Sequence, residues 1–139
     1  MFLNHPSFII CFDGHCILCN KFVDFLIRID KNNDFYFSTL QSDKTKTLLR
    51  AKGFNINELK AQDTIIVINQ GKVLLKSDAV LEIMLKLGGG YRFLSLCNFL
   101  PKFIRDSLYD FVAKRRIKWF GRLDSCRIPT SDEVKKFIN

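Results

Sequence analysis

Two cysteines separated by two residues, in the segment Cys16-Ile17-Leu18-Cys19, constrain the fold of this chain more than any other feature. The pair follows an apolar run over 8–12 and opens a segment with the periodicity of an amphipathic helix. A strand that leads into a helix through such a turn places the Cys16 sulfur at the helix N-terminus. Unpaired backbone N–H groups and the helix dipole favour a thiolate there. Because thiolates attack disulfides, the pattern predicts redox chemistry.

The order of the predicted elements indicates the fold. Helices are expected after Cys16, after a Ser42 N-cap and after a Ser77 N-cap. Strands are expected at 8–12, 35–37, 64–68 and 73–75. The first two strands are joined by a helix and should be parallel, whereas a turn makes the last two an antiparallel hairpin. This order predicts a thioredoxin-like α/β fold, a mixed four-stranded sheet with helices on both faces.

The rest of the chain is predicted to be helical. We expect one domain over 1–139, with a thioredoxin-like core over 7–90 and a helical extension over 91–139. A helix beginning near Pro101 should pack on the core through one apolar stripe, which is too large to leave in water. The stripe consists of Ile104, Leu108, Phe111, Val112 and Trp119.

The N-terminus lacks the basic segment of a signal peptide, and no apolar run approaches the roughly 20 residues of a spanning helix. These features predict a cytoplasmic protein without a membrane span. In a reducing compartment, the five cysteines argue for catalytic, metal-bound or buried thiols and against a disulfide framework.

The net charge of +8 is concentrated near the C-terminus. Such a cluster is typical either of a solvated helix face or of a surface for nucleic acid, anionic lipid or an acidic partner. We expect the solvated face, a monomer, and no function in nucleic-acid binding. The cluster consists of Lys114, Arg115, Arg116, Lys118, Arg122 and Arg127.

The segment from Asp13 to Cys19 resembles the Asp-x-x-Cys-x-x-Cys signature of the DCC family of predicted thiol-disulfide oxidoreductases. The later segment 109–129, with Arg115-Arg116 and 119–121, is also similar to that family. The resemblance implies a thioredoxin-like fold and a dithiol activity, but it supplies no physiological substrate.

One position departs from well-characterised thioredoxin-like enzymes, which usually carry a cis-proline before the third strand, facing the cysteines. Here that place falls at 62–64, and the three prolines lie elsewhere. We expect Thr64 to lie at the substrate site with a trans peptide bond, which would change how a substrate chain lies there.

Cys16 is the predicted nucleophile, partly exposed and with a lowered pKa, and Cys19 is the predicted resolving thiol. The alternatives are two unreactive cysteines or half of a zinc site completed by Cys126, Cys97 or His5. No second closely spaced ligand pair exists, so we expect no metal.

Asp13 either accepts the proton of Cys19 during resolution or bonds backbone N–H groups at the Cys16 turn. His15 either favours the Cys16 thiolate and contacts substrate or is an exposed loop residue. Cys11 is expected in the core, and Cys126 is a candidate third redox thiol.

The sequence therefore predicts a thiol-disulfide oxidoreductase that exchanges the Cys16–Cys19 pair with a protein or small-molecule disulfide. The dithiol carries both electrons, so we expect no bound cofactor, and an external thiol would restore the reduced form. The alternative is a non-catalytic binding module that docks through its basic C-terminal helices on nucleic acid, membrane or an acidic partner.

Overall fold

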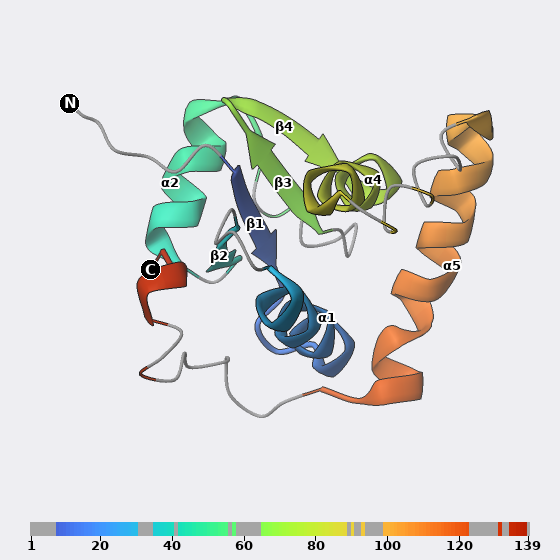
Figure 1. Ribbon diagram of the computed structural model, residues 1–139, viewed down its shortest axis with the longest axis horizontal. Helices are drawn as coiled ribbons and strands as arrows, with labels where there is room; N and C mark the ends of the chain where they lie inside the picture. The colour runs from blue at the N-terminus through green and yellow to red at the C-terminus, as the bar shows by residue number, and fades with distance from the viewer. Residues whose placement is uncertain are drawn as a thin grey trace.

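The computed structural model confirms a thioredoxin-like α/β fold. Its four-stranded sheet has the order β2-β1-β3-β4. β1 is parallel to β2 and antiparallel to β3, and β4 returns antiparallel to β3 (Figure 1). The strands are β1 (Phe8–Phe12), β2 (Tyr36–Thr39), β3 (Ile66–Asn69) and β4 (Lys72–Leu75). The structure describes residues 8–30, 35–40, 42–55, 57, 65–88, 90, 93, 99–122, 131 and 134–138.

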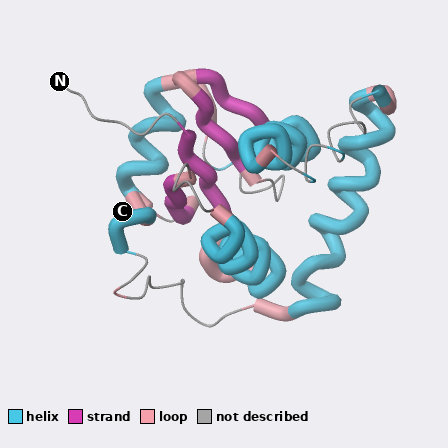
Figure 2. The backbone as a smooth tube through the Cα atoms, in the orientation of Figure 1, coloured by secondary structure: helices cyan, strands magenta, loops and turns pink. Residues whose placement is uncertain are grey.

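Helices cover both faces of the sheet (Figure 2). α1 (Ile17–Ile29) and α4 (Lys76–Leu87) pack on one face, and α2 (Asp43–Ala51) packs on the other. α5 (Lys102–Phe120) lies outside α1 and α4, so that these two helices separate it from the sheet (Figure 1). The molecule is thus layered as helix, sheet, helix pair and a further outer helix.

Strand β1 is buried along its whole length, as its apolar sequence predicts for a central strand. Side chains alternate between the faces of a strand. Phe8, Ile10 and Phe12 therefore enter the larger core beneath α1 and α4. Ile9 and Cys11 enter the smaller core beneath α2. The prediction that Cys11 is a core residue is confirmed, and burial raises the pKa of its thiol to about 12.

The C-terminal segment covers the edge of the sheet at β2. A short 3-10 helix, η2 (Val134–Lys136), leads to a parallel pairing of Phe137 with Phe37. The N–H of Ile138 donates to the carbonyl of Phe37 at 2.8 Å. This pairing satisfies backbone groups that an open edge would expose.

The expected helix caps differ from those in the structure. Ser42 occupies the N-cap position of α2, but its side chain makes no capping hydrogen bond. Ser77 is not a cap, because α4 begins at Lys76 with Leu75 as its N-cap. The Ser77 hydroxyl instead donates to the Asp106 carboxylate of α5.

The expected packing of α5 through its apolar stripe is wrong. Every residue of that stripe is exposed, Leu108 by 61% and Trp119 by 53%. The face turned toward the core carries Tyr109, Ala113 and Arg116 instead. These three residues lie four and three positions apart and so share one side of a helix.

Candidate active site

Cys16 lies where the turn after β1 meets the first residue of α1. Its N–H donates to the carbonyl of Asp13 at 3.2 Å, which closes the turn. Cys16 is the N-cap of α1, and its Sγ accepts the N–H of Cys19 at 3.3 Å. A cysteine sulfur thus takes the place that a serine or aspartate oxygen usually holds at a helix N-terminus.

The two thiols have pKa values shifted in opposite directions. The pKa of Cys16 is lowered to about 6, first by the hydrogen bond from the Cys19 side chain and also by the Cys19 N–H and the positive charge of Arg116. Burial and the Asp13 carboxylate oppose this shift. The pKa of Cys19 is raised, because it donates to the Cys16 sulfur and is largely buried. The pair therefore holds one proton near neutral pH, on Cys19.

Cys16 is fully buried, contrary to the expectation of partial exposure. The backbone of Arg122 pairs with that of Cys16 as an antiparallel bridge. The N–H of Ile17 also donates to the carbonyl of Gly121 at 3.4 Å. The chain leaving α5 thus runs beside the N-terminus of α1. Gly121 adopts a φ of +91°, a conformation that favours glycine.

Arg116 links the cysteine pair to Asp13. Its Nη1 donates to the Sγ of Cys19 at 2.9 Å, and its Nη2 donates to Oδ2 of Asp13 at 3.3 Å. A second cation, Arg122, places Nη1 3.7 Å from the same carboxylate oxygen. The other carboxylate oxygen of Asp13 accepts the N–H of His15 at 3.0 Å. Asp13 therefore bonds both to the turn before Cys16 and to the cation that contacts Cys19.

Arg116 was not predicted as a site residue; the sequence placed it in the basic cluster and in the segment that resembles the DCC family. Arg116 is 7% exposed, unlike its neighbours Lys114 and Arg115. Two features of the sequence pointed to it: the family-like segment 109–129 includes it, and it lies on the same helix side as Tyr109 and Ala113. Asn20 was also missed: its side-chain amide donates to the carbonyls of Gly14 and Cys16, each at 2.9 Å.

An apolar pocket of about 230 Å³ adjoins Cys19. α1, α4 and α5 line it together with Ile65, just before β3. The hydroxyl of Tyr109 accepts the N–H of Ile65 at 2.7 Å, and this hydrogen bond links α5 to the residue just before β3. Cys19 and Arg116 provide the polar part of the wall, and the apolar part includes Leu18, Phe22, Val80, Val112 and Ala113.

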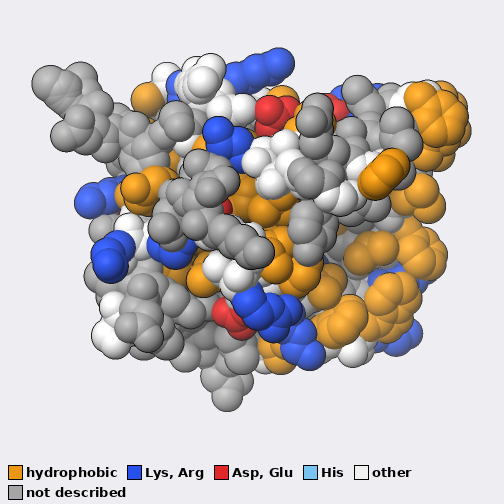
Figure 3. Space-filling model, viewed as in Figure 1, with side chains coloured by type: hydrophobic (Ala, Val, Ile, Leu, Met, Phe, Trp, Pro, Cys, Tyr) orange, Lys and Arg blue, Asp and Glu red, His pale blue; other side chains and the backbone are white. Residues whose placement is uncertain are grey.

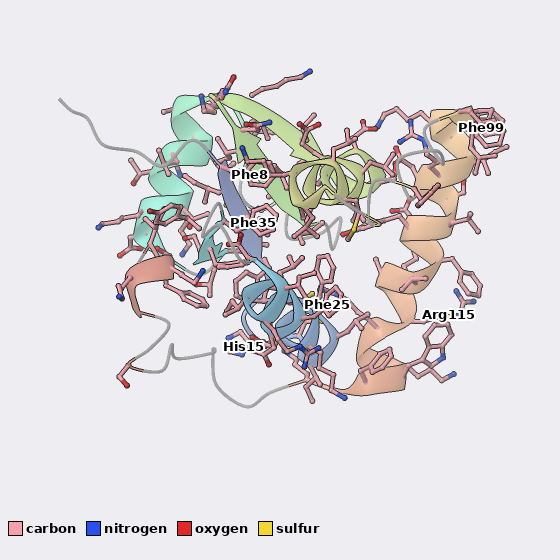
Figure 4. The ribbon with its side chains drawn as sticks, in the orientation of Figure 1. Phe8, His15, Phe25, Phe35, Phe99 and Arg115 are labelled. Carbon is pink, nitrogen blue, oxygen red and sulfur yellow. The ribbon has the colours of Figure 1, made fainter. Side chains whose placement is uncertain are left out.

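The structure brings together Asp13, Cys16 and Cys19. His15 lies beside them in the turn before α1 (Figure 4). Thr64 falls outside the described residues, as do the other candidate ligands or thiols, His5, Cys97 and Cys126. Within the described part of the chain, no helix is long and apolar enough to cross a bilayer.

Comparison with known proteins agrees with this arrangement. A family model described as DCC1-like thiol-disulfide oxidoreductase matches residues 10–122. The chain belongs to this family. The matched range of the DCC1-like family runs from β1 to Arg122 and so includes the cysteine pair, Asp13 and Arg116. Membership supports a redox role in general.

Two curated relatives cover most of this DCC1-like chain. It is 35% identical over 133 residues to the uncharacterized protein YuxK of Bacillus subtilis (strain 168), covering 96% of this chain and 95% of that protein. It is 36% identical over 121 residues to a chloroplastic DCC family protein of Arabidopsis thaliana, covering 86% and 69% respectively. No solved structure matches the chain significantly.

Proposed function

We propose that this protein is a thiol-disulfide oxidoreductase in which Cys16 attacks a substrate disulfide and Cys19 resolves the mixed disulfide. The lowered pKa of the Cys16 thiol carries this proposal. A thiol of this pKa is mostly thiolate at neutral pH, and the thiolate is the attacking form. Cys19 remains protonated until it is needed, because its proton is shared with the Cys16 sulfur.

The reaction has two steps. The Cys16 thiolate attacks one sulfur of a disulfide R–S–S–R′, forms the bond Cys16–S–S–R and releases R′S⁻. Cys19 then attacks the Cys16 sulfur, releases RS⁻, and its proton passes to the first thiolate. The pair ends as a Cys16–Cys19 disulfide, and the substrate gains two electrons. Two thiol groups of an external reductant then reduce the pair by exchange and themselves become a disulfide.

The charges around the pair suit this sequence of steps. Arg116 contacts Cys19 and therefore stabilises the thiolate that Cys19 must form during resolution. Asp13 keeps that guanidinium in place and is close enough to the pair to affect the pKa of Cys16. We propose that the core and the helical extension act as one domain, because α5 supplies this cation.

Access to Cys16 requires a local movement. We propose that the segment at Gly121 and Arg122 separates from the start of α1 when substrate binds, which exposes the Cys16 sulfur. The apolar pocket beside Cys19 would then receive an apolar group of the substrate next to its disulfide. We also propose that His15 and Thr64 contact the substrate.

Trapping of the mixed disulfide tests the assignment. Reduced wild type, Cys19→Ser and Cys16→Ser are each mixed with glutathione disulfide and mapped by mass spectrometry. Cys19→Ser should keep glutathione on Cys16, the wild type should form the internal disulfide, and Cys16→Ser should form no adduct at Cys19. Because Cys19 is the less buried sulfur, rapid labelling of Cys19 in Cys16→Ser would reverse the two roles and contradict the proposal.

A further inference from the structure

Helix α5 exposes most of its large apolar side chains, although its other side packs on the rest of the molecule. An amphipathic helix on a water-soluble protein usually buries its apolar stripe and exposes its charged side. In α5 the large apolar side chains face outward beside exposed cations, whereas the acidic side chains and Arg116 face the body. Phe111 is 50% exposed and Phe103 72% exposed. Figure 3 shows these apolar side chains gathered along the outer edge of the molecule, over α5.

Ion pairs form much of the inner contact of α5. Lys76 of α4 lies 3.1 Å from Asp110, and Asp78 of α4 accepts from Arg105 at 2.9 Å. Asp106 accepts a hydrogen bond from the Ser77 hydroxyl of α4. Both acidic residues of α5, Asp106 and Asp110, are thus used on the inner side.

The outer side of α5 carries aromatic, aliphatic and cationic side chains next to one another. The rings of Phe111 and Trp119 meet edge to face with centroids 6.0 Å apart. The guanidinium of Arg115 lies 3.9 Å from the centroid of the Phe111 ring. Lys114 and Lys118 are exposed beside them. Figure 4 shows Arg115 and Phe99 pointing away from the sheet and from α1.

Two properties of this outer face identify its partner. The face is formed by Phe103, Leu108, Phe111, Trp119 and the cations at 114, 115 and 118. The apolar area requires a partner that removes it from water. The cations and the lack of acidic side chains on the described outer side of α5 require that this partner be negatively charged. Tryptophan is enriched at membrane–water interfaces, and long lysine and arginine side chains reach the lipid phosphates there.

We propose that the outer face of α5 binds the surface of a membrane containing anionic lipids. The helix lies parallel to the bilayer, with Leu108, Phe111 and Trp119 among the upper acyl chains. Lys114, Arg115 and Lys118 lie at the level of the lipid phosphates. Arg116 and the cysteine pair stay on the opposite side of α5, so the redox site remains in water beside the membrane.

Trp119 allows a direct test because it is the only tryptophan of the chain. The full-length protein is mixed with vesicles of phosphatidylcholine alone or of phosphatidylcholine with phosphatidylglycerol. With the anionic vesicles, we expect a blue shift of Trp119 emission and co-sedimentation of the protein. Both signals should weaken with salt, because the cations act through screened charge.

Variants separate the apolar and the charged contributions. The double change Leu108→Ser and Phe111→Ser should abolish the blue shift. The triple change of Lys114, Arg115 and Lys118 to Gln should weaken binding roughly a hundredfold, at about fivefold for each cation. A matched control changes the exposed Lys44, Lys52 and Lys72 to Gln, removing equal charge elsewhere, and should bind as the wild type does.

Other outcomes would overturn the proposal. These are unchanged emission with anionic vesicles, or equal binding to phosphatidylcholine alone. A blue shift without lipid that grows with protein concentration, together with a doubled mass in sedimentation, would assign the face to a second copy of the chain. Binding to duplex DNA that survives Leu108→Ser and Phe111→Ser, without vesicle binding, would assign the cations to nucleic acid. The rate of Cys16 alkylation reports on folding in every variant, since none of these residues belongs to the redox site.

Discussion

The guanidinium of Arg116 lies 2.9 Å from the sulfur of Cys19, a residue 97 positions earlier in the chain. The same group lies 3.3 Å from the Asp13 carboxylate. One buried cation therefore faces both a thiol and a carboxylate, and the electrostatics of the dithiol depend on a helix outside the thioredoxin-like core.

The pH profile of alkylation should report the lowered pKa of Cys16. Only the thiolate reacts with iodoacetamide, so the rate should rise with pH and reach half its plateau near pH 6. Below that pH the rate should fall about tenfold for each pH unit. Cys11 should stay unmodified in the native protein over the same range, because it is buried and its pKa is raised. A midpoint near the value of a free cysteine would show that the Cys19 contacts do not stabilise the thiolate.

Changing Arg116 to Gln should raise the pKa of Cys16 by on the order of one unit, because the cation is lost while the Asp13 carboxylate remains. Asp13→Asn alone should lower that pKa. The double variant should lie close to the wild type, since the two effects oppose each other. The measurement is the alkylation midpoint of all four proteins.

The free energy of unfolding of the same four proteins should show the same coupling between Arg116 and Asp13. Arg116→Gln leaves the mostly buried Asp13 carboxylate without its closest cation, which should cost about 3 kcal/mol of unfolding free energy. The double variant should recover part of this loss. Additive effects of the two changes in both measurements would show that the two side chains act independently.

Gly121→Ala should increase the alkylation rate of Cys16. A side chain at φ +91° is strained, and its Cβ would lie 3.4 Å from Cδ1 of Ile17. A strain of about 1 kcal/mol would increase the open population of this segment roughly fivefold. Gly53→Ala is the matched control, because Gly53 has a φ of +87° at the end of α2 and open space around it. The control should lose similar stability without a change in alkylation; equal rates in both variants would show that this segment does not limit access.

Filling the apolar pocket should change substrate preference. Val80→Phe places a ring in the cavity beside Cys19. The KM for an aromatic disulfide such as 5,5′-dithiobis(2-nitrobenzoate) should rise roughly tenfold, the effect of losing about two buried methylene groups. The KM for hydroxyethyl disulfide, which has no large apolar group, should not change. A parallel rise for both substrates would mean that the pocket does not take part in recognition.

The sequence predicted the parts of the site that are local in the chain. The run over 8–12, the turn at Asp13 and the helix after Cys16 are set by neighbouring residues, and the structure shows them as expected. The parallel pairing of β1 with β2 and the hairpin of β3 with β4 also followed from local pattern and from the rules that govern connections between strands. Thr64 and Cys126 stay predictions, since both lie outside the described residues.

The position of α5 could not be predicted in the same way. Apolar periodicity shows which side of a helix is hydrophobic, and the usual inference is that this side is buried. In α5 the buried side is stabilised instead by pairs such as Lys76–Asp110 and by the Tyr109 hydroxyl bonded to Ile65. Each of these pairs joins residues far apart in sequence, and one sequence alone does not show which distant charges meet. Arg116 was missed for the same reason.

The contacts of Arg116 with Cys19 and Asp13 have a consequence for the newly made chain. The turn and α1 leave the ribosome early, whereas Arg116 follows only after most of the protein has been translated. Until α5 docks, the two sulfurs and Asp13 lack the guanidinium that joins them in the finished protein. A nascent chain halted before α5 should therefore carry the full cysteine motif without the mature reactivity, so that the redox centre is completed among the last steps of folding.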